Sequence, residues 1–159
     1  MLEWKQQRVI DADIETVWEL FRDRNIQKIM PKVENHVLIE KQENEAGAKH
    51  EQTYREGKRL ETYIVETLAY EDTENKKRKK IEFNLAKAFG IHLAFTLEQI
   101  NGQQTLFIYE GTNKGTNFVG RAMMKLASKK SNMEVVRDFL DLVEQEALKS
   151  SESSHVNKP

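Results

Sequence analysis

Three polar residues at alternating positions, His50, Gln52 and Tyr54, are the side chains in this sequence best placed to do chemistry. They lie in segment 49–56, whose period of two indicates a β-strand. The opposite face of that strand is polar or charged: Lys49, Glu51, Thr53 and Arg55. This second face is typical of a solvent-exposed surface, so we expect the first three side chains to point into the protein.

Polar side chains that point into the protein can be accommodated in only a few ways. A buried polar group costs a few kcal/mol unless it is paired, so these side chains must bond one another, meet a buried carboxylate, or face water or a ligand. One hypothesis is a non-catalytic binding site, or a polar row wetted at the edge of the sheet. The alternative is an enzyme of the cyclase/dehydratase or hydrolase type, with His50 as general acid/base and Tyr54 as proton donor or oxyanion partner.

The remaining candidates for metal or cofactor chemistry are weak. We expect His36 and His92 at the surface and His155 in a polar tail. No His/Asp/Glu group has metal-ligand spacing, and the chain has no cysteine to ligate a metal or act as a nucleophile. The glycines at 111 and 115 precede a helix but follow no nucleotide-binding pattern. The sequence therefore predicts neither a metal nor a cofactor.

Composition restricts the remaining functional classes. The length of 159 residues suits one domain, which we place at 1–149, followed by a disordered polar tail at 150–159. Lys and Arg number 25 against 26 Asp and Glu, so no global field favours nucleic acid. Apolar runs are too short for a transmembrane segment, and the start lacks a signal-peptide core. We therefore expect a cytoplasmic protein.

Strands precede a long C-terminal helical segment in the predicted order of elements. A strand ends at Val9-Ile10, short helices follow at 14–23 and 26–30, and about six hairpin-connected strands occupy 33–110. Apolar residues then recur at helical spacing: Phe118, Ala122, Leu126, Met133, Val136, Leu140, Val143 and Ala147. This favours one helix from about residue 116 to 149, either straight or kinked near Lys130; the alternative is two helices with a capping box at Ser131.

Short motifs along the chain support a particular fold family. They are Val9-Ile10-Asp11-Ala12, Val17-Trp18-Glu19-Leu20-Phe21-Arg22-Asp23, Met30-Pro31-Lys32-Val33 and Gly47. With the element order, they resemble the helix-grip fold of the START-like (SRPBCC) superfamily, which includes the birch-pollen-allergen type and the polyketide cyclase/dehydrase and lipid-transport type. The resemblance covers roughly residues 4–148, and Asp13 stands where proline is frequent in the family.

This resemblance implies an α+β fold with an interior cavity. A curved antiparallel sheet of about seven strands would wrap around one long C-terminal helix, with two short helices between strands 1 and 2. The cavity would hold a small hydrophobic or amphipathic, lipid- or polyketide-like ligand and should exceed about 300 Å³. A further alternative is a protein-interaction domain with a filled core.

Strand alternation and the apolar helix face together give the expected ligand-binding residues. We place the mouth of the cavity at the end of the sheet that carries Phe89 and Phe118, because mobile loops with an apolar rim suit an opening. The expected ligand-binding residues are His50, Gln52, Tyr54, Phe83, Phe89, Leu93, Phe95, Phe118, Ala122, Met123 and Leu126.

One charge run has two interpretations. It consists of Lys76, Lys77, Arg78, Lys79 and Lys80. It could make a weak contact with an anionic surface, or form a solvated hairpin end that resists edge pairing. Acidic neighbours such as Glu74 and Glu82 reduce its field, which favours the solvated hairpin.

Overall fold

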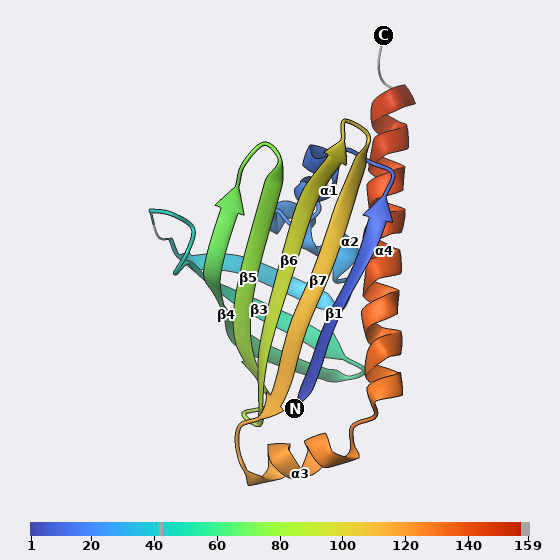
Figure 1. The fold of residues 1–159 in the computed structure, drawn as a ribbon. Helices are drawn as coiled ribbons and strands as arrows, with labels where there is room; N and C mark the ends of the chain where they lie inside the picture. Colours follow the sequence, from blue (N-terminus) through green and yellow to red (C-terminus); the bar gives the residue numbers. More distant parts are fainter. Residues whose placement is uncertain (42, 157–159) are drawn as a thin grey trace.

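A seven-stranded, curved antiparallel sheet forms the body of the protein, as the sequence predicts (Figure 1). The computed structural model describes residues 1–41 and 43–156. The strand order across the sheet is β1-β7-β6-β5-β4-β3-β2, so β1 closes against the last strand. The strands are β1 (Leu2–Ile10), β2 (Val33–Glu40), β3 (Lys49–Glu56), β4 (Arg59–Asp72), β5 (Lys76–Leu85), β6 (Phe89–Asn101) and β7 (Gln104–Gly115).

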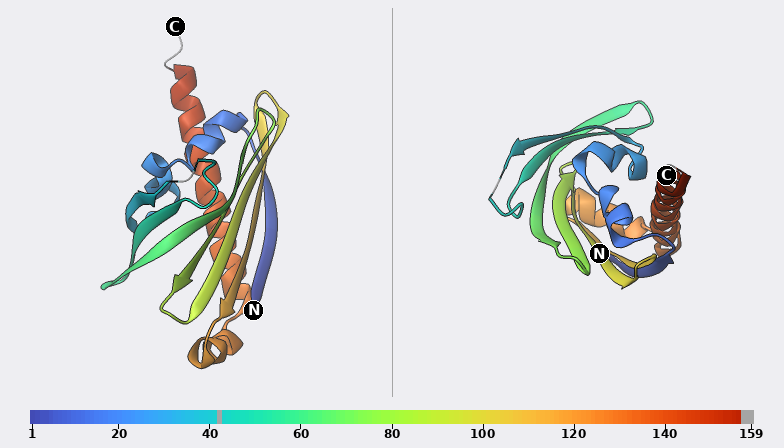
Figure 2. Two further views of the ribbon diagram at one scale, coloured as in Figure 1. Left: turned by 90° about the vertical axis from the view of Figure 1, so that its left-hand side faces the viewer. Right: turned by 90° about the horizontal axis from the view of Figure 1, so that it is seen from above.

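Short helices fill one end of the concave side of the sheet. α1 (Ile14–Glu19), η1 (Asp23–Asn25) and α2 (Ile26–Ile29) lie between β1 and β2 in the chain and inside the curve of the strands (Figure 2). Asp13 caps α1, because its carboxylate accepts a hydrogen bond from the Thr16 amide at 3.2 Å. These helices carry the buried apolar residues that close this end of the core.

Hairpins alternate between the two ends of the sheet. The β3–β4 and β5–β6 turns lie at the end that also carries α3 (Phe118–Leu126), whereas the β4–β5 and β6–β7 hairpins lie at the other end (Figure 1). Gly57 in the first of these turns has φ 61°, a conformation that glycine adopts without strain. This alternation of hairpins determines which loops can border an opening at each end of the sheet.

The C-terminal segment forms two helices, so the prediction of one continuous helix is wrong. α3 is followed by α4 (Lys129–Val156), and Ala127 between them is extended, with ψ 133°. Ser128, and not Ser131, caps α4, since its hydroxyl accepts from the Ser131 amide at 3.3 Å. α4 also continues through residues 150–156, which were expected to be disordered; residues 157–159 lie outside the described part.

Contacts with the β5–β6 turn explain why α3 leaves the line of α4. The Asn117 side chain caps α3 at the Gly120 amide (2.8 Å) and donates to the Lys87 carbonyl (2.9 Å). A Cβ at Gly120 would lie 2.0 Å from the Ala88 carbonyl oxygen, so only glycine permits this approach. α3 therefore crosses the end of the sheet, and its apolar register does not continue into the core.

α4 supplies the predicted apolar face in its own part of the chain. It runs beside β1 and the short helices (Figures 1 and 2). Its buried residues are Val136, Leu140, Val143 and Ala147. Phe139 extends the contact into an aromatic group with Phe95 and Tyr109, at ring-centroid distances of 5.9 and 4.6 Å. Arg8 of β1 pairs with Asp141 and Glu144 of α4 beside this core.

Candidate functional site

A cavity of about 510 Å³ lies between the sheet and α4, and we call it the main cavity. Its walls are mostly apolar or aromatic, and the charged side chains among them come from the β3–β4 hairpin. The lining residues are Met30, Val33, Gln52, Tyr54, Glu56, Arg59, Glu61, Tyr63, Ile81, Phe83, Leu85, Ala86, Phe89, Leu93, Tyr109, Val135 and Phe139. Its volume is in the range of small-molecule sites.

Polar atoms enter the main cavity from one wall. Gln52 is 6 % exposed, and its amide nitrogen donates to the Tyr63 hydroxyl at 2.7 Å. The Tyr63 ring stacks on Phe83, with centroids 5.0 Å apart and an angle of 18°. Burial raises the pKa of Tyr63, so its hydroxyl stays protonated near neutral pH. Gln52 and Tyr63 can therefore orient a polar group of a bound molecule whose body contacts hydrocarbon.

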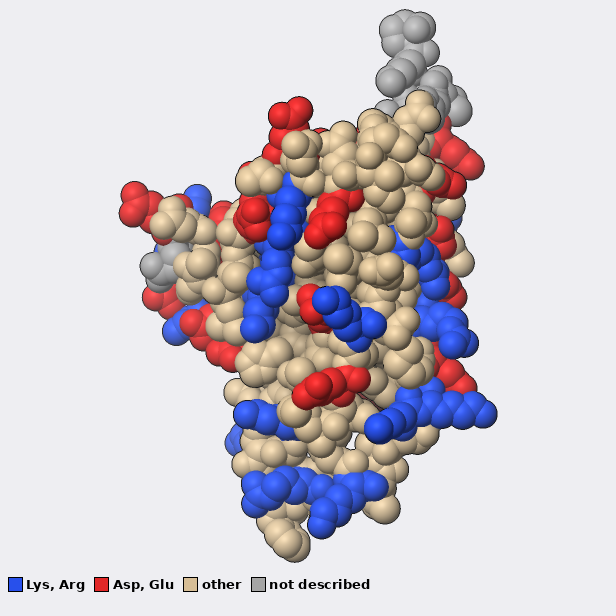
Figure 3. Space-filling view, in the orientation of Figure 1, with Lys and Arg blue, Asp and Glu red and all other residues tan. Residues whose placement is uncertain are grey.

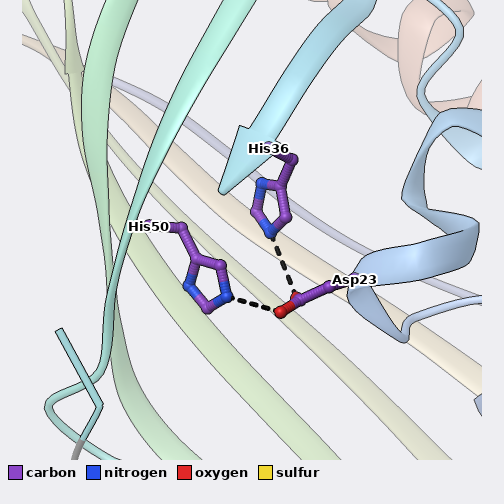
Figure 4. Close-up of side chains that lie close together, drawn as sticks. All are labelled: Asp23, His36 and His50. Carbon is purple, nitrogen blue, oxygen red and sulfur yellow. Dashed lines mark hydrogen bonds and ion pairs between the residues drawn. The ribbon is translucent and has the colours of Figure 1, made fainter. Parts of the chain in front are cut away.

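Behind Gln52, the His–Asp cluster of Asp23, His36 and His50 extends this polar row (Figure 4). His36 Nε2 lies 3.2 Å from Asp23 Oδ1, and His50 Nε2 lies 2.8 Å from Asp23 Oδ2. His36 Nδ1 is 2.8 Å from Gln52 Oε1. One hydrogen-bonded chain thus connects Asp23 through His36 and Gln52 to Tyr63 at the cavity wall.

The electrostatics of the cluster favour a charged Asp23. Hydrogen bonds from His36, and then from His50, hold the pKa of the Asp23 carboxyl well below its usual range. Lys79 borders a small space that His36 and His50 also line. Burial lowers the pKa of its amino group, while the Asp23 charge opposes this. The Asp23 carboxylate therefore forms hydrogen bonds with two imidazoles, and its negative charge partly offsets the desolvation of the Lys79 amino group.

The cluster also offers three metal-ligand atoms that the sequence spacing did not reveal. One donor atom each from Asp23, His36 and His50 lies within 4.8 Å of the others. The two imidazole rings are stacked, however, with centroids 4.4 Å apart and an angle of 15°. In-plane lone pairs of nearly parallel rings do not converge on one ion, and Lys79 adds positive charge nearby. The geometry thus fits a hydrogen-bonded cluster better than a metal centre.

The predicted ligand-binding residues separate into three groups. Gln52, Tyr54, Phe83, Phe89 and Leu93 line the main cavity. His50 and Phe95 instead border a small space of about 20 Å³ beside the His–Asp cluster. Four residues of α3 contact neither space, because α3 crosses the end of the sheet and leaves them exposed: Phe118, Ala122, Met123 and Leu126.

The candidate catalytic pair is not assembled as one unit. His50 is buried, as the strand alternation predicts, but its partner is Asp23. Tyr54 is half-buried and donates to Glu56 at 3.0 Å. His36 was expected at the surface, yet its side chain is only 7 % exposed and stacks on His50. Asp23 and Tyr63 were also absent from the predicted site residues. Tyr63 lies opposite Gln52 in the β3–β4 pair, so strand alternation places both side chains on the same face of the sheet.

The basic run is less exposed than expected. Lys77 is 2 % exposed, and its amino group pairs with Asp72 and, at 2.8 Å, with Glu15 of α1. Lys79 is two residues further along β5, so its side chain points to the same face as Lys77, and it borders the small space. The interpretation of the whole run as a solvated hairpin end is therefore wrong, because two of its five residues face the interior.

Comparison with known protein families identifies the family of this chain. The family described as polyketide cyclase / dehydrase and lipid transport matches residues 1–147. The chain belongs to this family. The sheet, the short helices after β1 and the C-terminal helix are those of the helix-grip fold of the START-like superfamily, as the sequence motifs predicted. No curated protein matches the chain in a sequence comparison.

Solved structures with this fold include proteins of different kinds. A START superfamily protein from Mycobacterium smegmatis is 11% identical with a TM-score of 0.71, over 92% of this chain and 97% of that one. A major latex-like protein from Panax ginseng is 19% identical (TM-score 0.64, 94% and 97% covered). Norcoclaurine synthase from Thalictrum flavum, solved with dopamine and hydroxybenzaldehyde, is 10% identical (0.61, 93% and 87%). At these identities the likeness shows the fold and leaves the activity to be argued from the site.

Proposed function

We propose that this protein binds a small hydrophobic or amphipathic ligand in the main cavity, as a non-catalytic cytoplasmic carrier or sensor. The observation that carries the proposal is an apolar cavity of about 510 Å³ with one polar wall at Gln52 and Tyr63. Apolar walls supply binding energy without direction, and a few fixed polar groups orient the ligand. A lipid- or polyketide-like molecule with one polar end has this pattern.

The placement of the polar residues supports binding over catalysis. A general acid/base must reach the reacting group, directly or through one water. His50 borders the small space and is held by Asp23, whereas Tyr54 lies in the main cavity and bonds Glu56. The hydrogen-bonded chain from Asp23 instead supports a structural role, because it fixes the orientation of Gln52. The volume of the main cavity also argues against a filled-core interaction domain.

A fluorescent-probe titration tests this proposal. We expect N-phenyl-1-naphthylamine, an uncharged apolar probe, to gain fluorescence on binding the wild-type protein. Leu85→Trp adds bulk to the cavity wall and should weaken probe binding by roughly tenfold or more. Leu68→Trp is the matched control, since Leu68 is on the same sheet but 36 % exposed and outside the cavity lining. Native mass spectrometry of freshly purified protein should detect a bound small molecule.

Two results would contradict the proposal. The first is no probe binding by a folded wild-type protein together with no copurified molecule in the native mass spectrum. The second is equal loss of binding in Leu85→Trp and Leu68→Trp, which would show that the probe does not occupy the main cavity.

A further inference from the structure

α3 is an amphipathic helix whose apolar face is turned away from the protein. At about 100° per residue, five of its six apolar side chains fall within an arc of roughly 140°, and Met124 lies outside it. The five are Phe118, Val119, Ala122, Met123 and Leu126, which we call the outer face of α3. All five are exposed, and Phe118 and Leu126 reach 80 % and 88 %. A surface helix normally buries this face, so its exposure needs a partner.

Specific contacts with the β5–β6 turn fix the orientation of α3. Gly120, on the side away from the outer face, is buried against the Ala88 carbonyl. Asn117 holds the first turn to Lys87. Turning the apolar residues inward would remove these bonds and force a side chain into the space that only Gly120 fits. The outer face is therefore held toward solvent.

Basic residues gather near this apolar surface. Between Glu110 and Glu134 the chain has no acidic residue and five basic ones: Lys114, Arg121, Lys125, Lys129 and Lys130. In the view of Figure 3, the lower end of the molecule, where Figure 1 places α3, displays Lys and Arg but no Asp or Glu. Arg121 and Lys125 border the outer face along its Phe118 edge, where long basic side chains can reach lipid head groups.

We propose that the outer face of α3 docks onto an anionic lipid bilayer. An apolar arc bordered by basic residues is the pattern of a helix that lies in the membrane interface. A second copy of this chain fits less well, because a twofold pairing of the outer faces would bring the basic residues of both copies together. Docking by α3 is peripheral, and no helix in the described part of the chain is long and apolar enough to cross a membrane.

Docking would bring the main cavity to the bilayer surface. α3 is anchored on the β5–β6 turn, and Ala86 and Phe89 of that turn line the cavity. The exposed Val135, near the start of α4, lines it too. An apolar ligand could then move between cavity and bilayer with little exposure to water. This consequence rests on the proposed function, whereas the membrane contact itself does not.

Vesicle cosedimentation of the full chain tests the docking. We expect wild-type protein to bind vesicles of phosphatidylcholine mixed with phosphatidylglycerol and to bind pure phosphatidylcholine vesicles much less. The double variant Phe118→Asp/Leu126→Asp should lower binding to the mixed vesicles by roughly tenfold or more. Ile100→Asp is the matched control, since Ile100 is 48 % exposed at the opposite end of the sheet and should keep wild-type binding.

Charge and self-association give two further measurements. Arg121→Gln/Lys125→Gln should weaken binding to the mixed vesicles and reduce its salt dependence. Absence of vesicle binding by the wild type, or equal loss in Ile100→Asp, overturns the proposal. So does a wild-type dimer in sedimentation velocity that the Phe118→Asp/Leu126→Asp variant lacks. Because the probe titration uses no vesicles, failure of docking and failure of ligand binding are separate results.

Discussion

Two leucines with the same helical periodicity should differ strongly in their response to truncation. Leu126 and Leu140 both fit the apolar spacing of the C-terminal segment. Leu140 is 4 % exposed in the core under α4, whereas Leu126 is 88 % exposed on α3. Leu140→Ala and Leu126→Ala remove the same atoms, so the difference between them measures the tertiary environment alone.

The expected magnitudes are far apart. Truncating a buried leucine costs about 2–5 kcal/mol, because hydrophobic transfer energy is lost and a cavity remains. For a protein of this size each kcal/mol lowers the melting temperature by about 2–4 °C, so Leu140→Ala should lose about 4–20 °C. Leu126→Ala removes little buried surface and should change the free energy of unfolding by no more than about 0.5 kcal/mol.

Urea denaturation followed by circular dichroism gives both free energies, and a thermal melt supplies a second estimate. The m-values should match that of the wild type, which shows that the unfolded states are comparable. Equal destabilisation by the two substitutions would refute the division into α3 and α4, because it would mean that Leu126 packs in the same core as Leu140.

Three further predictions concern the site and its supports. Phe89→Asp should weaken probe binding, since Phe89 lines the main cavity, while the exposed Lys76→Gln should not; the reverse order would place the opening at the other end. Asp23→Asn should cost about 1 kcal/mol of unfolding free energy near pH 7, discounted because the carboxylate is half-exposed. Since the pKa of folded Asp23 lies below its ordinary value of 3.8, the wild-type advantage is present above that pH and should shrink as the pH falls below it; a constant gap between about pH 7 and pH 3 in urea titrations would oppose this. Gly120→Ala should displace α3 and cost about 1–3 kcal/mol, because its Cβ would meet the Ala88 carbonyl; unchanged hydrogen exchange in α3 would contradict it.

The sequence alone determined the features that depend on the local period of the chain. Alternation in β3 correctly placed His50 and Gln52 on the buried face. Helical spacing identified the buried face of α4 around Leu140. These patterns are readable because a side chain's direction relative to its own strand or helix follows from backbone geometry. With the order of elements, they were sufficient for the fold.

Tertiary structure decided which of these faces meet and which stay apart. Asp23 joins His36 and His50 across three separate elements, and no spacing within one element reports such a meeting. The apolar face of α3 has the same period as that of α4, yet Phe118 is exposed because Gly120 packs on the β5–β6 turn. Periodicity gives the direction of a side chain within its element, whereas contacts between distant segments decide whether that direction leads to core, cavity or solvent.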